Sequence, residues 1–135
     1  MQTYHLADEF TDPSGEQALL ASLAVAPARY WELEDTLHAD LFPTETATWQ
    51  ALTIALEAGH AAAVPAAWRP APDPPATAQR LHDLHQRRLL ATAQERLAQA
   101  LFDETVPASA IATLLEAEAL RVQAALRDIT AGHLQ

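Results

Sequence analysis

Two histidines with the spacing of a metal-binding pair, His82 and His85, stand three positions apart in the second half of the chain. On a helix this spacing places both imidazoles on one side, where they could bind a transition metal ion. Such a site needs further converging ligands, but Asp83 falls on a different side of the helix and the chain has no cysteine. We therefore interpret both histidines as solvated surface side chains and predict neither a metal nor a cofactor.

The sequence also lacks the residues of common catalytic sites. A P-loop requires a glycine-rich segment followed by lysine, but this chain has no lysine and its three glycines are isolated: Gly15, Gly59 and Gly132. Neither Ser14 nor Ser22 lies in the pattern of an activated nucleophile. We therefore predict that the chain is not an enzyme and does not hydrolyse ATP.

Arginine is the only strongly basic residue, and four arginines share one expected helix: Arg80, Arg87, Arg88 and Arg96. They could contact single-stranded nucleic acid, or they could dock a protein partner. No aromatic side chain lies between them to stack on bases, and the net charge of −10 repels phosphate. We favour the protein contact and predict weak or no direct DNA binding, with nucleic-acid binding by this helix as the alternative.

The elements that would position these residues are all expected to be helices, because glycine and β-branched residues are sparse. Apolar spacing predicts three short helices, over residues 15–26, 27–38 and 44–58. Ser14 is the expected N-cap of the first helix, Thr44 or Thr46 that of the third, and Gly59 the left-handed residue that ends it. This predicts an all-α fold, in which a small orthogonal helical lobe precedes a long antiparallel helical hairpin.

Aromatic residues at helical spacing are expected to form the core of the lobe rather than a ligand cage. Tyr30 and Trp31 are the predicted buried aromatics of the second helix, and Phe42 is expected to fill the space between helices. A cluster of prolines after the third helix predicts a linker and a domain boundary. The predicted organisation is a flexible arm over 1–13, the helical lobe over 14–69, a proline-rich linker over 70–75 and the hairpin over 76–131.

Two long helices, over about 76–102 and 107–130, are expected to form the hairpin. Apolar residues of the second helix recur at spacings of four and three, as in a helix–helix seam. A two-helix hairpin alone buries little surface, so this one is expected to need a partner. The predicted self-association residues are Leu90, Leu97, Leu101, Leu115, Ala119, Val122, Leu126 and Ile129.

The order of several segments resembles the N-terminal domain and helical hairpin of DnaB-type replicative helicases, over residues 13–60 and 80–126. The resemblance rests on Pro13, Glu16, Leu19 to Leu23, Asp40, Phe42, Trp49, Leu52, Gly59, the run Arg87-Arg88-Leu89-Leu90, and the pair Ala117-Glu118. Pro43 replaces the aromatic residue of the family's turn, and the stretch from Ala61 to Pro75 is shorter than in the family. The ATPase motor of those helicases has no counterpart here.

The resemblance implies a module of the primosome that acts in DNA replication by protein–protein contact. In that family, hairpins of neighbouring subunits pair and the N-terminal domains form a collar where primase and loader proteins dock. We therefore expect a homo-oligomer, either a dimer or a ring of dimers, that binds a replicative helicase, primase or loader. A helicase-binding domain of primase type, or a free-standing helicase regulator, is the alternative. The polar start of the chain and the lack of a long apolar run predict a soluble, cytoplasmic protein without membrane contact.

Overall fold

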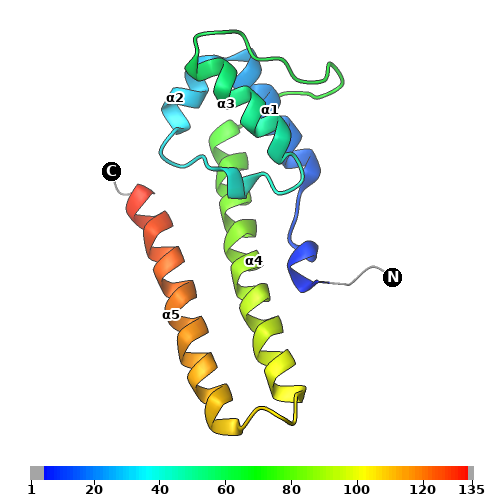
Figure 1. Ribbon diagram of the computed structural model, residues 1–135. Helices are drawn as coiled ribbons and strands as arrows, with labels where there is room; N and C mark the ends of the chain where they lie inside the picture. Colours follow the sequence, from blue (N-terminus) through cyan, green and yellow to red (C-terminus); the bar gives the residue numbers. More distant parts are fainter. Residues whose placement is uncertain (1–4, 134–135) are drawn as a thin grey trace. The chain divides into compact units, whose positions relative to one another are not determined.

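The fold is all-α, as predicted. The computed structural model describes the backbone of residues 5–133 and the side chains of residues 5–126, and no strand occurs among them (Figure 1). The α-helices are α1 (Pro13–Val25), α2 (Pro27–Leu33), α3 (Thr46–Glu57), α4 (Pro74–Phe102) and α5 (Ala108–His133). Two short 3-10 helices, η1 (Leu6–Glu9) and η2 (Ala39–Leu41), complete the described secondary structure.

The chain packs as two units, which we call the lobe and the hairpin unit. The lobe comprises Thr11–His85, and the hairpin unit comprises Gln86–Gln135 together with the residues up to Phe10. The boundary lies within α4 rather than in the proline-rich stretch at 70–75. The reason is that Ala78, Leu81 and Leu84 of α4 are buried and belong to the core of the lobe.

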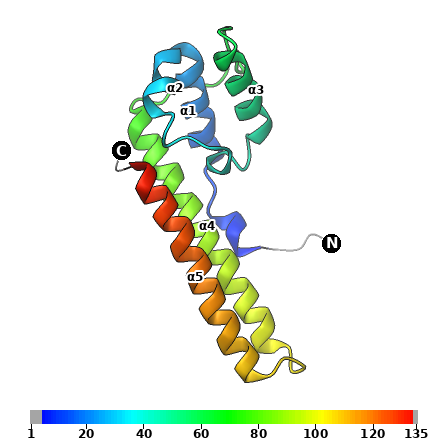
Figure 2. The ribbon, with the colours of Figure 1, turned by 60° about the vertical axis from the view of Figure 1, so that its left-hand side comes forward.

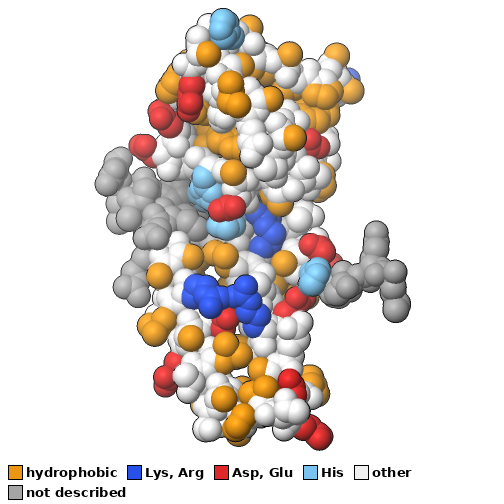
Figure 3. Space-filling view, in the orientation of Figure 1, with side chains coloured by type: hydrophobic (Ala, Val, Ile, Leu, Met, Phe, Trp, Pro, Cys, Tyr) orange, Lys and Arg blue, Asp and Glu red, His pale blue; other side chains and the backbone are white. Residues whose placement is uncertain are grey.

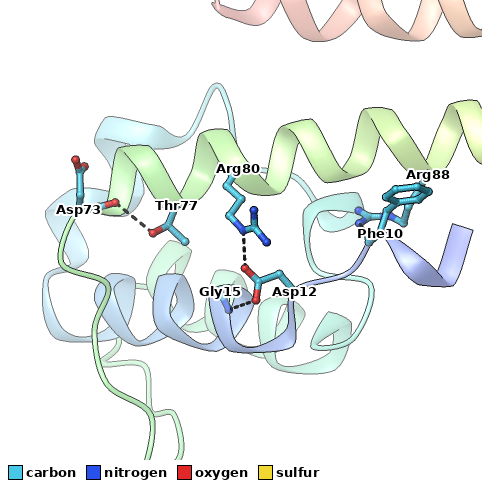
Figure 4. A network of polar contacts seen from close by, with 7 residues as sticks. All are labelled: Phe10, Asp12, Gly15, Asp73, Thr77, Arg80 and Arg88. Atoms are coloured by element: carbon cyan, nitrogen blue, oxygen red, sulfur yellow. Dashed lines mark hydrogen bonds and ion pairs between the residues drawn. The ribbon is translucent and has the colours of Figure 1, made fainter.

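The start of α1 is capped by Asp12 rather than by Ser14, so the predicted N-cap is wrong. The Asp12 carboxylate accepts a hydrogen bond from the backbone N–H of Gly15 at 3.0 Å. It also forms an ion pair with Arg80, whose Nε lies 2.9 Å from Asp12 Oδ2 (Figure 4). Pro13 occupies the first helical position, where its missing N–H costs nothing. The Arg80 hydrogen bond is the largest influence on this carboxyl and lowers the pKa of Asp12, although partial burial opposes the shift.

The start of α3 is held by a residue of α1 rather than by the predicted Thr44 or Thr46. The Glu16 carboxylate is fully buried, and its Oε1 accepts the backbone N–H groups of Thr44 and Glu45, each at 3.0 Å. Thr44 and Glu45 directly precede the first turn of α3, so the buried carboxylate fixes the backbone at the point where that helix begins. At the other end of α3, Gly59 adopts a φ of +77°, which confirms the predicted left-handed residue.

The core of the lobe is formed by leucines of α1 with aromatic residues of the following segments. Phe42 is fully buried, as predicted, and stacks on Trp49 with ring centroids 4.7 Å apart. The predicted burial of Trp31 is wrong, because its side chain is 52% exposed. Tyr30, its neighbour in α2, is buried instead; this burial, with a hydrogen bond to Glu57, raises the pKa of Tyr30 to about 12. Adjacent helical residues differ by about 100° in direction, so only one of the two can face the core.

In the hairpin unit, α4 and α5 run antiparallel and lie side by side in both ribbon views (Figures 1 and 2). The turn between them is stabilised by Asp103, whose carboxylate accepts the N–H of Thr105 at 3.0 Å and its hydroxyl at 2.6 Å. Hydrogen bonds from Thr105 lower the pKa of Asp103. No helix in the described part of the chain is long and apolar enough to cross a membrane.

Candidate self-association surface

The two units differ sharply in how many apolar side chains they bury. Among the described side chains, the fully buried apolar residues of α1, α2, α3 and the start of α4 all belong to the lobe. Among the described residues of the hairpin unit, Ala91 is the one apolar residue whose side chain is buried. The hairpin unit therefore has almost no apolar core of its own, although it contains α5 and the larger part of α4.

An apolar groove of about 420 Å³ runs between α4 and α5 within the hairpin unit. Its walls consist mostly of leucine, alanine and valine side chains, with a few polar groups among them. The lining residues are Leu90, Ala93, Gln94, Leu97, Leu115, Glu118, Ala119, Val122, Gln123 and Leu126. The groove is open to solvent in the single chain, and its size and lining would allow it to bind apolar side chains of another helix.

Most of the predicted self-association residues line this groove. They are Leu90, Leu97, Leu115, Ala119, Val122 and Leu126. Leu90 and Leu115 are about half exposed, at 52% and 54%. Leu101 is 65% exposed and does not line the groove, and the side chain of Ile129 lies outside the described residues. The seam that the sequence pattern indicates is therefore present as a continuous surface, although its role in self-association stays a prediction.

A charged cluster at the groove contains two residues that are not among the predicted site residues, Glu118 and Arg121, and one that is, Arg96. Glu118 is only 3% exposed and lines the groove, and its Oε1 is 3.3 Å from Arg96 Nη1 and 3.2 Å from Arg121 Nη1. Arg96 belongs to α4, whereas Glu118 and Arg121 belong to α5, so the cluster joins the two helices. The i, i+3 spacing of Glu118 and Arg121 was the available sequence signal, because such pairs meet on a helix surface.

The four predicted partner-contact arginines do not form one patch. Arg80 is paired with Asp12 in the lobe, and Arg88 donates a hydrogen bond to the carbonyl oxygen of Phe10 at 2.6 Å in the hairpin unit (Figure 4). Arg96 belongs to the Glu118 cluster. Arg87 is exposed, but it is nine residues from Arg96 and so faces the opposite side of α4 at about 100° per residue. This dispersal does not favour a basic track for nucleic acid.

The N-terminal segment from His5 to Phe10 is docked along α4 within the hairpin unit. The backbone N–H of Leu6 donates to the Glu95 carboxylate, and His5 Nδ1 lies 3.4 Å from the same group. The Leu6 hydrogen bond, followed by that from His5, lowers the pKa of Glu95. Part of the predicted flexible arm is therefore a helical turn held by side-chain contacts, a non-local arrangement that local sequence patterns do not reveal.

The interpretation of both histidines as solvated surface side chains is wrong for His82, which is buried. His82 is 3% exposed and bonds through Nε2 to the carbonyl oxygen of Thr36. His38 joins the pair, with its ring centroid 5.4 Å from that of His82 and 5.2 Å from that of His85. No group of three metal-ligating side chains among the described residues has an arrangement that could hold a metal ion. The lobe thus uses these rings in packing between α4 and the segment that follows α2.

Comparisons of this chain with protein-family models, with curated proteins and with solved structures found no match. The apolar groove in the hairpin unit is lined mostly by aliphatic side chains, which suit the apolar side of another helix.

Proposed function

We propose that this chain is a non-catalytic interaction module that self-associates through its α4–α5 hairpin. The observation that carries the proposal is the exposure of the hairpin's leucines along the groove, in a unit with almost no apolar core. Full burial of one leucine contributes roughly 1.5–3 kcal/mol relative to exposure. Covering the groove with another helical surface would therefore be favourable.

A second copy of the chain is the occupant that the charges favour. Residues 86–135 contain six acidic and five basic side chains, so two hairpin units scarcely repel each other. Residues 11–85 contain ten acidic and three basic side chains, so two lobes would repel. An apolar groove can pair with itself about a two-fold axis, and two antiparallel hairpins then form a four-helix bundle.

We further place this module in DNA replication, as a counterpart of the collar domain of DnaB-type helicases. What supports this step is the order of the sequence motifs, together with an all-α fold in which a long antiparallel hairpin follows shorter helices. In this proposal, paired hairpins build a dimer or a ring of dimers, and the acidic lobe is the surface for a primase, loader or helicase. The module itself contributes contacts and no catalysis.

A charge placed in the groove tests self-association directly. Val122→Asp puts a carboxylate on the groove wall, where a second copy would bury it without a partner. At about 2 kcal/mol or more per unpaired group, and with two groups per symmetric dimer, the loss is about 4 kcal/mol. Each 1.4 kcal/mol is tenfold in affinity, so the dissociation constant should rise by roughly a thousandfold.

The matched control for this variant is Ala124→Asp. Ala124 is exposed, does not line the groove and faces about 200° away from Val122 on α5. Sedimentation velocity should show wild type and Ala124→Asp associating alike, whereas Val122→Asp stays monomeric at the same concentrations. Equal association of all three proteins would refute the hairpin as the self-association surface.

A further inference from the structure

The buried carboxylate of Glu118 is an unusual group for an apolar groove. Its side chain is 3% exposed, whereas the side chains of Arg96 and Arg121 that pair with it are 49% and 58% exposed. The acidic group thus lies at the bottom of the cluster and the guanidinium groups extend toward its surface. Figure 3 shows basic side chains flanked by apolar ones on the hairpin unit.

The composition of this cluster restricts how a second hairpin can cover the groove. The cluster carries two positive charges and one negative charge, so it retains a net positive charge beside the leucines. A hairpin that covered the guanidinium groups with apolar side chains would remove them from water without adding acceptors, which is costly. Arrangements that leave both arginines at the edge of the interface, or opposite polar groups, avoid this cost.

The leucine seam by itself does not select one alignment of the two hairpins. Apolar residues that repeat at spacings of three and four allow parallel, antiparallel and shifted pairings of similar stability. A single polar residue in an apolar seam is known to select one register, at some expense in affinity. Gln94 and Gln123 also line the groove, but they are neutral and adapt to several arrangements.

We propose that the Arg96–Glu118–Arg121 cluster determines the alignment of the two hairpins in the self-associated protein. The cluster acts by excluding misaligned pairings and contributes little to affinity. This inference rests on the proposed function, because it concerns the interface formed when a second copy fills the groove. Its residues are positioning residues, and they have no catalytic part.

Spin-label distance measurements can test this role, because the natural chain has no cysteine and a single introduced one gives one label per copy. Gln99→Cys provides an exposed site on α4 outside the groove lining. The label is placed in four backgrounds: wild type, Arg96→Leu/Glu118→Leu/Arg121→Leu, the charge-swapped Arg96→Glu/Glu118→Arg/Arg121→Glu, and Glu116→Leu. Glu116 is an exposed acid of α5 outside the groove and serves as the matched control.

The expected result is one narrow label-to-label distance in wild type, in the Glu116→Leu control and in the charge-swapped protein. The triple-leucine variant should still associate, with a dissociation constant within about tenfold of wild type, because apolar replacement of a buried ion pair is often neutral. It should show two or more distances, because misaligned pairings are no longer excluded. A single distance in the charge-swapped protein would show that the paired charges select the alignment of the two hairpins, and that leucine packing does not.

Other outcomes contradict the inference in recognisable ways. A single unchanged distance in the triple-leucine variant, or several distances in the charge-swapped protein, would overturn the alignment role. A triple-leucine variant that is monomeric while wild type associates would show that the cluster provides affinity instead. Wild type without any label-to-label distance would contradict the proposed self-association itself. Circular dichroism of each variant checks that the helices are retained.

Discussion

The buried Glu16 carboxylate provides the sharpest stability prediction for the lobe. It is fully buried on α1, and its Oε1 accepts the backbone N–H groups of Thr44 and Glu45 at 3.0 Å each. These two bonds hold the segment that directly precedes α3 against α1. Glu16→Ala removes both of them and leaves two backbone donors in the lobe without this acceptor.

The size of the effect follows from these contacts. Hydrogen bonds to a charged group contribute roughly 1.5–3 kcal/mol each, and the substitution also leaves a cavity. Relief of the cost of burying a carboxylate offsets part of the loss. We expect Glu16→Ala to lower the free energy of unfolding by about 3 kcal/mol. Glu16→Gln keeps an acceptor oxygen of similar shape and should lose about 1 kcal/mol, since neutral acceptors are weaker.

Urea unfolding followed by tryptophan fluorescence measures these differences, because Trp49 is buried against Phe42. All proteins must be compared at one concentration, since self-association would add to apparent stability. Glu32→Ala is the matched control: Glu32 is exposed and paired with Arg29, and such pairs contribute 0–1 kcal/mol. A Glu16→Ala protein as stable as the Glu32→Ala control would refute the assigned role of this carboxylate.

Two further predictions concern acid stability and catalysis. Because the pKa of Asp12 is lowered by Arg80 and Gly15, its contribution is present above the unfolded pKa of about 3.9 and is lost as pH falls through the folded value. Asp12→Ala should therefore cost about 1 kcal/mol at neutral pH, and this difference should shrink below about pH 4 in unfolding curves recorded against pH. Purified protein should not hydrolyse ATP above the buffer blank, and a rate that rises in proportion to protein concentration would contradict the non-catalytic proposal.

Sequence patterns predicted the features that depend on local periodicity. The spacing of Leu19, Leu20 and Leu23 indicated the buried side of α1, and the glycine at position 59 indicated the left-handed end of α3. The groove residues of α5 were found in the same way, because a helix brings residues four and three apart onto one side. In each case the pattern and the structural feature lie within a few residues of each other.

Features that depend on distant contacts could not be predicted in this way. Glu16 bonds to the backbone of the two residues that precede α3, about thirty positions further along the chain, and only the packing of α1 against this segment creates that pairing. His38 meets His82 for the same reason. Ser14 was a plausible N-cap by residue type, but Asp12 precedes a proline that can begin the helix and it also meets Arg80. Local preference is too weak to decide between such neighbours.

The mass of the protein in solution, measured by light scattering over a wide concentration range, tests the central claim most directly. The proposed function predicts a mass that rises from that of one chain to that of a dimer, or of a ring of dimers, as concentration increases. Val122→Asp should stay at the mass of one chain over the same range. A wild-type protein that remains monomeric at every concentration would contradict self-association through the hairpin.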